Sequence, residues 1–562
     1  MSNRGFTSRF RGLVALLCVL GLTLAPMLAK AASVSSAPAR SAATGTLTVS
    51  GTVADAYEAY RLFDAEVVDG GSGGKVASNV TWASDAVRDA ALPAMREAGM
   101  DASSAAAQDA AEWLDADGHM TPSLAMKLAR AIRAAGVGPV ALPAGQAAEL
   151  PVGYWLVVAD DGAIGESQAG TAPIFALVGG ASVTVAPKAA TPEVCKHVLE
   201  DSDGAWSKAA DATVGDDLYW RLAATIPAGL AGYDAYTVEF ADAMSAGLDP
   251  AKVASSAHVY VAAETGGGFD AVTVSGGSAD TEPADGWTDI TSGCDVTVDS
   301  AANTFTVRTG DLIAALGGAE KFAAGARVVV VYNAPLRAGA NRGTEKGNPN
   351  EVYLRYPRSP FSDLGGEGGY TRTPSDRATA YTWELALTKR ASDGYKPLPG
   401  AALNITDDRG RTLAVDGTWD AQGKTTVTTG EDGRVTVSGV DSGKLEVREL
   451  KAPKGYTAFE GARCVTVKAE GLDVDQVAAA KPKLTITAES PLRADSADGT
   501  TGSLEASLIN TPTGTPPNIF TGGDMPSTGD MAMFAAAAVA VAGAVLIVVA
   551  LLVKRGGGDH KE

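Results

Sequence analysis

The chain is poor in the residues from which disulfide frameworks and metal sites are built. Its 562 residues include four cysteines and four histidines. Without an N-terminal segment that carries Cys18, only Cys195, Cys294 and Cys464 remain, too few for a disulfide framework, although a Cys195 to Cys294 bridge stays open. The histidines lack metal-ligand spacing, and the sequence has neither a nucleophile elbow nor a phosphate loop. We therefore expect no metal and no cofactor, and a surface enzyme is the weakest functional hypothesis.

Basic residues are scarce relative to acidic ones. Lysine and arginine number 46 against 66 aspartate and glutamate residues, which gives a formal net charge of −20. So negative a surface repels nucleic-acid phosphates and anionic membranes. We therefore expect no nucleic-acid partner.

The first residues have the pattern of a secretory signal peptide. Arg4, Arg9 and Arg11 precede an apolar segment at 13–24, and a small-x-small cleavage pattern ends at Ala31. We expect residues 1–31 to be removed on export.

The last residues have the pattern of a membrane-spanning segment. An uncharged apolar run at 531–553 is long enough to cross a bilayer as a helix. Lys554 and Arg555 open the tail 554–562 and favour its retention in the cytoplasm.

A pentapeptide at 525–529 stands just before this run. It resembles the Leu-Pro-x-Thr-Gly cell-wall sorting signal of Gram-positive surface proteins, with Met525 in place of leucine. The resemblance implies that a sortase, either housekeeping or pilus-specific, cuts between Thr528 and Gly529 and attaches Thr528 to peptidoglycan. The protein would then be secreted and covalently bound to the cell wall. An ordinary single-pass anchor is the alternative.

Composition divides the exported part into three mostly β domains. An N-terminal β domain at 32–188 contains an alanine-rich stretch at about 85–135 with helical periodicity, which predicts a helical insertion. Segments 189–375 and 378–512 consist of short alternating strands separated by turn residues, a rhythm typical of Ig-like β-sandwiches. Residues 513–524, rich in Pro, Thr and Gly, read as a linker.

Three polar side chains of the last domain fall on apolar strand faces. Strand alternation puts Lys389, Glu449 and Asn510 each on the face that a sandwich buries. Burial lowers the pKa of an amine and raises that of a carboxyl, which yields a nucleophilic amine and an acid able to polarise a carboxamide. If the three meet, amine attack and loss of ammonia would leave a Lys389–Asn510 isopeptide bond. A buried Lys389–Glu449 salt bridge is the alternative.

The same domain resembles a known family. Residues 449–456 resemble the E-box of collagen-adhesin B-type (Cna-B) domains, 509–512 resemble their closing strand, and 398–401 resemble the turn after their first strand. The resemblance covers about 381–512 and implies a self-catalysed crosslink promoted by Glu449.

The middle domain carries a similar set with an aspartate. Alternation places Lys196, Asp242 and Asn350 on inward faces. Asn348 occupies the same face as Asn350 and is a rival acceptor.

Two phrases, 240–248 and 347–354, resemble the isopeptide-forming second domain of Gram-positive fimbrial backbone proteins. Carried over, the resemblance implies that Lys196 and Asn350 are joined and that Asp242 is the promoting acid.

The first domain differs. Its opening strand at 45–53 contains no lysine, so we expect no internal crosslink there. Lys188, at its end, resembles the pilin-motif lysine that a pilus-specific sortase joins to the next subunit. Two motif positions are not matched, since Gly179 stands where the family has tryptophan and Ala186 replaces an aromatic residue. A plain solvated lysine is the alternative.

Two main hypotheses of function follow. The first is a fimbrial subunit (pilin), stabilised by isopeptide bonds, attached by sortase and serving adhesion, with other pilin subunits as partners. The second is a monomeric wall-anchored adhesin that binds a host or bacterial surface ligand. An acceptor lysine at Lys188 distinguishes them.

Overall fold

The computed structural model describes residues 43–51, 53–69, 74–116, 118–187, 191–228, 232–263, 268–275, 278–318, 321, 325–362, 369–415, 417–476 and 480–514. The expected signal peptide, Lys188, the pentapeptide with Thr528 and Gly529, and the apolar run at 531–553 lie outside these residues. Within them, no helix has the length and apolar character needed to span a bilayer. The described chain is mostly β and forms tandem domains, as expected.

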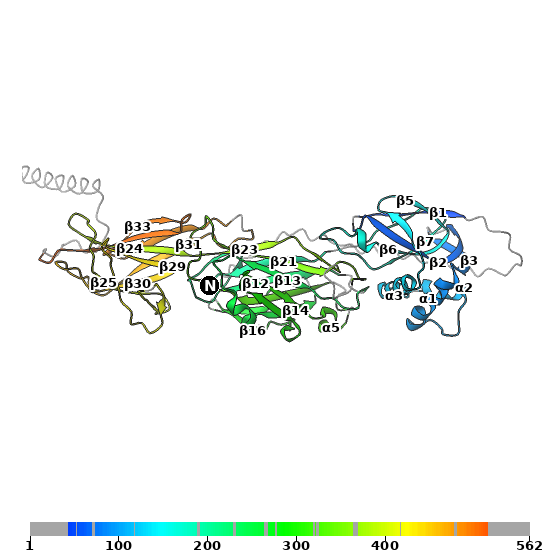
Figure 1. Cartoon of the computed structure of the whole chain (residues 1–562), viewed down its shortest axis with the longest axis horizontal. Coiled ribbons are helices and arrows are strands. Elements are labelled where there is room, and N and C mark those ends of the chain that lie inside the picture. The colour runs from blue at the N-terminus through cyan, green and yellow to red at the C-terminus, as the bar shows by residue number, and fades with distance from the viewer. Residues whose placement is uncertain are drawn as a thin grey trace, which may run out of the picture. The chain divides into compact units, whose positions relative to one another are not determined.

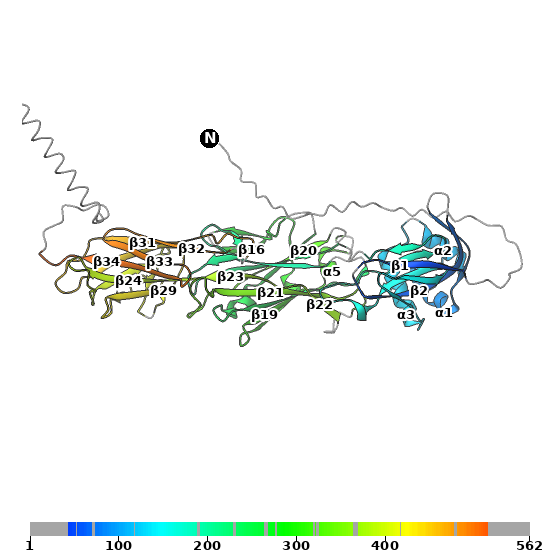
Figure 2. The same cartoon turned by 90° about the horizontal axis from the view of Figure 1, so that it is seen from above.

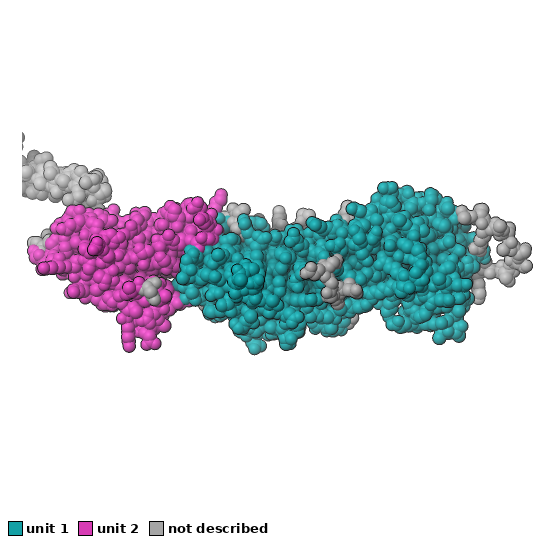
Figure 3. All heavy atoms as spheres, viewed as in Figure 1, with its two compact units in different colours: residues 1–340, 348–380, 472–480 teal, residues 341–347, 381–471, 481–562 magenta. Residues whose placement is uncertain are grey.

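The fold divides into two compact units (Figure 3). Unit 1 comprises Met1–Ala340, Asn348–Ala380 and Leu472–Ala480, and unit 2 comprises Asn341–Gly347, Tyr381–Gly471 and Lys481–Glu562. Unit 1 holds the first and second domains, and unit 2 holds the third. Ala378 and Ala380 pair with Asn350 and Asn348 in a sheet of the second domain. The third domain therefore starts at Tyr381 rather than at the expected residue 378.

The first domain combines two sheets with a helical layer (Figure 1). The sheets have the orders β5-β1-β8 and β3-β2-β6-β7, with β4 paired to β2. The strands are β1 (Thr44–Val49), β2 (Ala56–Asp69), β3 (Lys75–Trp82), β4 (Val140–Pro143), β5 (Ala147–Pro151), β6 (Gly153–Ala159), β7 (Ile174–Val178) and β8 (Val183–Val185). The helices are α1 (Asp85–Glu97), α2 (Ala107–Asp115) and α3 (Pro122–Ala134), with a 3-10 turn η1 (Asp161–Ala163). They confirm the insertion expected at about 85–135.

Local signals set where these helices begin. The side chains of Ser84 and Thr121 accept hydrogen bonds from backbone N–H groups in the first turns of α1 and α3, and Pro122 opens α3. The apolar faces of the helices, which include Leu128, share one core with Leu156 of β6. Packing against the sheet therefore stabilises helices that would be marginal in isolation.

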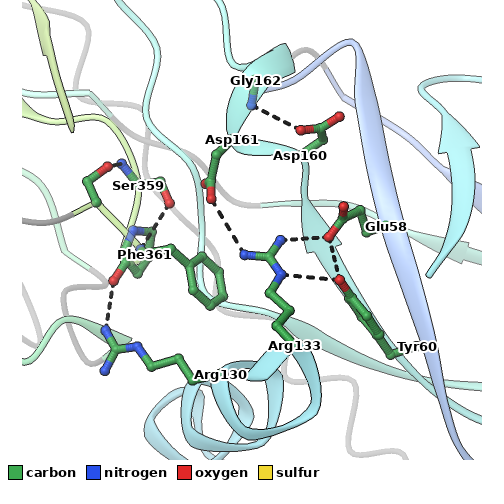
Figure 4. A network of polar contacts seen from close by, with 11 residues as sticks. Glu58, Tyr60, Arg130, Arg133, Asp160, Asp161, Gly162, Ser359 and Phe361 are labelled. Carbon is green, nitrogen blue, oxygen red and sulfur yellow. Dashed lines mark hydrogen bonds and ion pairs between the residues drawn. The ribbon is translucent and has the colours of Figure 1, made fainter. Parts of the chain in front are cut away.

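A polar network joins the first and second domains inside unit 1 (Figure 4). Arg133 of α3 donates to Glu58 Oε2 at 2.8 Å and to Tyr60 Oη at 3.2 Å, and its guanidinium lies 3.5 Å from Asp161 Oδ2. The ring of Phe361, from the second domain, lies 4.3 Å from the guanidinium carbon. Cation–π stacking and three polar contacts thus meet at one planar cation.

The second domain is a two-sheet sandwich. One sheet has the order β10-β9-β12-β20-β14-β17, the other β11-β23-β21-β13-β19-β18 with β22 beside β21, and β15 and β16 form a separate hairpin. The strands are β9 (Glu193–Leu199), β10 (Trp206–Ser207), β11 (Ala209–Asp211), β12 (Tyr219–Ile226), β13 (Glu239–Met244), β14 (His258–Ala263), β15 (Val272–Ser275), β16 (Ser278–Pro283), β17 (Thr288–Asp289), β18 (Asp295–Asp299), β19 (Thr304–Arg308), β20 (Ala326–Asn333), β21 (Asn348–Pro357), β22 (Tyr370–Arg372) and β23 (Asp376–Tyr381). Short helices are η3 (Pro250–Lys252), α4 (Val253–Ser256), η4 (Thr291–Gly293) and α5 (Leu312–Leu316).

Every residue of β20 is buried, because this central strand is covered on both faces. Val328, Val330 and Tyr332 face the main core. Val329 and Val331 face a smaller core that also contains Val272 of β15 and Ala279 of β16.

The third domain is also a two-sheet sandwich. One sheet has the order β29-β24-β34-β33 and the other β27-β26-β25-β30-β31-β32, with β28 beside β25. The strands are β24 (Trp383–Ala391), β25 (Ala402–Thr406), β26 (Thr412–Leu413), β27 (Trp419–Asp420), β28 (Val427–Thr428), β29 (Arg434–Val440), β30 (Gly443–Lys451), β31 (Ala462–Glu470), β32 (Lys483–Ala488), β33 (Leu492–Asp498) and β34 (Ser503–Asn510). The first strand β24 and the last strand β34 run parallel side by side (Figure 2).

Candidate functional site

The third domain brings its three expected residues together. Lys389 on β24 pairs with Leu508 of the parallel strand β34, so Asn510 lies two residues further along on the same face. Glu449 comes from β30 in the other sheet. The exposed fractions are 0% for Lys389, 7% for Glu449 and 2% for Asn510. The amine, the acid and the amide therefore meet in the core between the two sheets.

Their polar atoms contact one another directly. Lys389 Nζ donates to Asn510 Oδ1 and lies 2.9 Å from Glu449 Oε1, which also accepts from Asn510 Nδ2 at 2.9 Å. The backbone N–H of Phe459 donates to Glu449 Oε2 at 3.2 Å, and the Phe459 ring lies 5.8 Å from Lys389 Nζ. The Lys389 amine thus contacts the Asn510 side-chain amide, and the Glu449 carboxyl contacts both groups.

Burial alters the charge of this lysine. It lowers the pKa of Lys389 from 10.5 to about 8, although hydrogen bonding and charge attraction from Glu449 oppose the shift. A substantial fraction of the amine is then neutral near pH 8. A neutral buried amine in contact with a carboxamide is a competent nucleophile.

The second domain brings together its own set, from both sheets. Lys196 lies on β9, while Asp242 on β13 and Asn350 on β21 lie on the facing sheet. In the pairing of β13 with β21, Asn350 is opposite Met244, which makes Asp242 and Asn350 diagonal neighbours on one face. All three side chains are at most 2% exposed.

A fourth residue, Tyr332 of β20, links this set. Lys196 Nζ contacts Asp242 Oδ2 and donates to Tyr332 Oη at 2.9 Å. Asn350 Nδ2 donates to the same hydroxyl at 2.8 Å, and the hydroxyl donates to Asp242 Oδ2 at 3.1 Å. The expectation missed Tyr332 because the sequence offers no signal for it: in a strand buried on both faces, alternation does not mark a special position.

The rival acceptor Asn348 is oriented differently. It is equally buried, but its amide nitrogen donates to the carbonyl of Ala380 at 3.2 Å. A Cβ atom on Gly247 would lie 2.0 Å from Asn348 Oδ1, so this side chain packs against the turn after β13. The geometry therefore favours Asn350, which shares a hydroxyl with Lys196.

Burial shifts both members of the Lys196–Asp242 pair toward neutrality. It lowers the pKa of Lys196 to about 8 and raises the pKa of Asp242, each opposed by attraction from the other. Two buried oxygens, Asp242 Oδ1 and Asn350 Oδ1, have no hydrogen-bond partner among the described residues. Protonation would turn Asp242 from an acceptor into a hydrogen-bond donor, which is the form of the acid that can polarise an amide.

An ion pair binds the Lys196 backbone on the side of β9 that faces away from β12. The Lys196 N–H donates to Asp376 Oδ2 at 2.7 Å, and Lys208 Nζ donates to the Lys196 carbonyl at 2.7 Å while contacting Asp376. Lys208 is 6% exposed. The pair therefore satisfies the two backbone groups as a neighbouring strand would.

The three cysteines in the described part of the chain form no disulfide. Cys195, Cys294 and Cys464 are all free, so the open possibility of a Cys195 to Cys294 bridge is not realised. Burial raises the pKa of the Cys195 thiol. Among the described residues, no group of three or more histidine, cysteine or acidic side chains is placed to hold a metal ion.

Comparison with known proteins gives a family match within the third domain. Residues 384–481 match the SpaA family, described as a prealbumin-like fold domain. A 121-residue stretch is 30% identical to the trypsin-resistant surface T6 protein of Streptococcus pyogenes serotype M6, which is 20% of this chain and 20% of that protein. The chain thus matches about a fifth of the length of this curated relative.

Solved structures of similar proteins include two backbone or major pilins. The T6 backbone pilin of Streptococcus pyogenes has 17% identity and a TM-score of 0.45, over 84% of this chain and 98% of that one. The major pilin SpaD of Corynebacterium diphtheriae has 16% identity and a TM-score of 0.41, over 84% and 98%. Residues 384–481 are thus similar to the SpaA prealbumin-like fold domain, and a 121-residue stretch of the chain is similar to a streptococcal surface protein.

Proposed function

We propose that the chain is a structural subunit of a Gram-positive pilus, stabilised by one isopeptide bond in each of its second and third domains. The observation that carries the proposal is the pair of buried clusters, Lys389 with Glu449 and Asn510, and Lys196 with Asp242 and Asn350. A buried ion pair alone seldom recovers its desolvation cost. Two such clusters occur in consecutive domains, and each includes an asparagine amide near the amine. Formation of an isopeptide bond explains them better than a buried ion pair alone.

The reaction follows from the contacts. The buried ammonium gives one proton to the acid, and the neutral Nζ attacks Cγ of the asparagine. A bond between Nζ and Cγ forms, the bond between Cγ and Nδ2 breaks, and the amide nitrogen takes one proton from the attacking amine and leaves as ammonia. The acid keeps its proton and donates a hydrogen bond to the new carbonyl. Since the chain modifies only itself, we propose a structural role rather than an enzymatic one.

The positions of the bonds suit a subunit under tension. In the third domain the bond would join the first strand β24 to the last strand β34. Force applied at the domain ends would pass through covalent bonds instead of peeling strands apart. By analogy with disulfides that close loops of this size, each bond would also stabilise its domain by about 4 to 5 kcal/mol.

Anchoring and partners form the second part of the proposal. Sortase attachment through Thr528 would place the protein on the cell wall, with peptidoglycan and other pilin subunits as partners. Polymerisation would use Lys188 as the acceptor of the next subunit's threonine. Adhesion to a host or bacterial surface would be the biological outcome.

A monomeric wall-anchored adhesin is the second candidate, and one observation favours it. At Gly179, where the pilin motif has tryptophan, φ is +130°, and a Cβ atom would lie 2.7 Å from Val152 Cγ1 and 2.8 Å from Val67 Cβ. No side chain fits there without rearrangement. The backbone and packing at position 179 therefore accept glycine and exclude tryptophan. This position sets the chain apart from the family's acceptor motif.

An immunoblot of wall material decides between the two. Protein released by muramidase and boiled in SDS is compared for wild type, Lys188→Ala and the control Lys127→Ala, whose lysine is a half-exposed residue of α3. A ladder that collapses to one band only in Lys188→Ala supports the pilus subunit. A single band in all three supports the monomeric adhesin.

A further inference from the structure

The two clusters differ in how the amine reaches the amide. In the third domain, Lys389 Nζ touches Asn510 itself. In the second domain, within the described residues, Lys196 Nζ makes no hydrogen bond to Asn350, and both instead bind the hydroxyl of Tyr332, at 2.9 and 2.8 Å. The second domain therefore has a bridging group that the third domain lacks.

The hydroxyl is held by parts of the fold that do not depend on it. Tyr332 is fully buried, and its ring packs edge to face against Phe305 with centroids 4.7 Å apart. The ring also belongs to the main core of the domain. Removing the oxygen alone should leave the ring in place.

The hydrogen bonds of the hydroxyl are complete. Its oxygen accepts from Lys196 Nζ and Asn350 Nδ2, and its own hydrogen goes to Asp242 Oδ2. It therefore touches the atom that must lose a proton, the atom that must gain one, and the acid.

We propose that the Tyr332 hydroxyl is a catalytic residue of the second-domain crosslink, carrying a proton from the Lys196 amine to the departing nitrogen of Asn350. The inference rests on the proposed function, because it assigns a role within the same reaction. The proposal adds a proton relay to the acid, amine and amide of the second domain. It predicts that the third domain needs no relay, because Lys389 contacts Asn510 directly.

The proton balance is as follows. Direct transfer from Lys196 to Asp242 neutralises both groups, after which Asp242 Oδ2 no longer requires the hydroxyl hydrogen. As Nζ bonds to Cγ of Asn350, the Tyr332 oxygen accepts a proton from Nζ and gives its own proton to Nδ2, which leaves as ammonia. The hydroxyl ends as it began, and one amide is exchanged for another.

The surroundings suit a relay that never ionises. Burial raises the pKa of Tyr332 well above its ordinary value, and the neighbouring Asp242 raises it further, so the hydroxyl stays neutral throughout. A neutral hydroxyl that accepts and donates in one step avoids a buried phenolate. Such a role also explains why a tyrosine oxygen is kept among three other buried polar groups.

The test compares Tyr332→Phe with wild type and with Tyr356→Phe. Tyr356 lies in the same core, and its hydroxyl is buried without a hydrogen-bond partner among the described residues, so it is a matched control. The chain is made by cell-free synthesis and sampled over time, and crosslinked peptides are quantified by mass spectrometry. Tyr332→Phe should slow the Lys196 to Asn350 crosslink about 100-fold, the size expected for loss of a proton-transfer group. The Lys389 to Asn510 crosslink should form at the wild-type rate in every variant.

Each other outcome has a distinct meaning. If wild type contains no Lys196 to Asn350 peptide, the proposed reaction at this site fails and the relay fails with it. If wild type and Tyr332→Phe crosslink equally fast, the reaction stands and the relay is overturned.

A purely structural role is tested where no bond can form. Unfolding temperatures are compared for Asn350→Ala with and without Tyr332→Phe. Similar values would assign the kinetic defect to the reaction. Failure of the double variant to fold, while Asn350→Ala folds, would show that the hydroxyl is needed for packing and would overturn the proposal.

Discussion

Lys389 Nζ lies 2.9 Å from Glu449 Oε1, although the two residues belong to different sheets of the third domain. Neither group is exposed, so neither can be satisfied by water. Removing the acid leaves a buried amine without the group that accepts its proton, and the cost of an unpaired buried charge is several kcal/mol. The first prediction follows from this pair.

Glu449→Gln should abolish the Lys389 to Asn510 bond. The glutamine cannot accept the ammonium proton, so the amine stays charged and does not attack. Intact-mass measurement should find the wild-type exported region lighter than its calculated mass by two ammonia molecules, and Glu449→Gln lighter by one. The control Glu446→Gln alters a half-exposed carboxyl on the same strand and should keep both losses. Two ammonia losses in Glu449→Gln would contradict the role of this acid.

The second prediction concerns pH and the uncrosslinked third domain. Asn510→Ala removes the acceptor and leaves Lys389 buried, with a pKa of about 8 in the folded state against 10.5 when exposed. Below pH 8 the amine is protonated in both states. Between pH 8 and 10.5 the unfolded chain binds more protons, so the free energy of unfolding should rise with pH, in total by about 3 kcal/mol.

Chemical denaturation at pH 7 and pH 10 measures this rise. The double variant Asn510→Ala with Lys389→Met lacks the buried amine and should lose the rise, while all other titrating groups remain. Parallel pH profiles for the two variants would mean that Lys389 titrates normally in the folded domain.

The third prediction concerns the ion pair that holds the Lys196 backbone. Lys208→Met removes the donor to the Lys196 carbonyl and leaves Asp376 without its ion-pair partner. Since the strand that carries the nucleophile is then less firmly placed, the Lys196 to Asn350 crosslink should form at least tenfold more slowly, one decade per about 1.4 kcal/mol of lost positioning. Peptide mapping over time measures the rate.

A matched control is available in the same domain. Lys252 forms an exposed ion pair with Asp217, so Lys252→Met should leave the rate unchanged. Equal slowing by both substitutions would point to a general loss of stability rather than to positioning of Lys196.

The sequence predicted the inward-facing residues well because a two-layer β fold buries alternate side chains. Lys389, Glu449, Asn510, Lys196 and Asp242 are all buried as alternation required. The parts it could not predict are of two kinds. Tyr332 stands in a strand without alternation, and the backbone of Lys196 is held by Lys208 and Asp376, whose meeting depends on how distant strands are brought together.

The domain boundary shows the same limit. The sequence pattern places residues 378–380 in the third domain, but they extend a sheet of the second domain. The pairing of β23 with β21 is a long-range contact, and the local sequence pattern does not predict it. Residues 472–474 likewise bond to Ser207 and Lys208 of unit 1 although the surrounding sequence belongs to unit 2.

The last prediction concerns the joint between the first and second domains. Arg133 binds Glu58 and Tyr60 in its own domain and stacks on Phe361 of the next (Figure 4). Arg133→Lys keeps the charge but cannot form the planar fork or the stack, so the contact across the joint should weaken. Arg88 on α1 pairs with exposed carboxylates of its own helix, so Arg88→Lys is the control.

Hydrogen exchange of the backbone around Phe361 reports the effect, because a loosened joint exposes amides that the contact now shields. Exchange there should speed up in Arg133→Lys and stay at the wild-type rate in Arg88→Lys, with both crosslinks still complete. Arg130, which donates to the carbonyl of Pro360 at 2.9 Å, would still hold part of the loop, so the change should be partial. Unchanged exchange in Arg133→Lys would mean that the stack adds nothing to the joint, which the Arg130 bond and the bond from the Gly170 N–H to the Arg358 carbonyl would then hold without it.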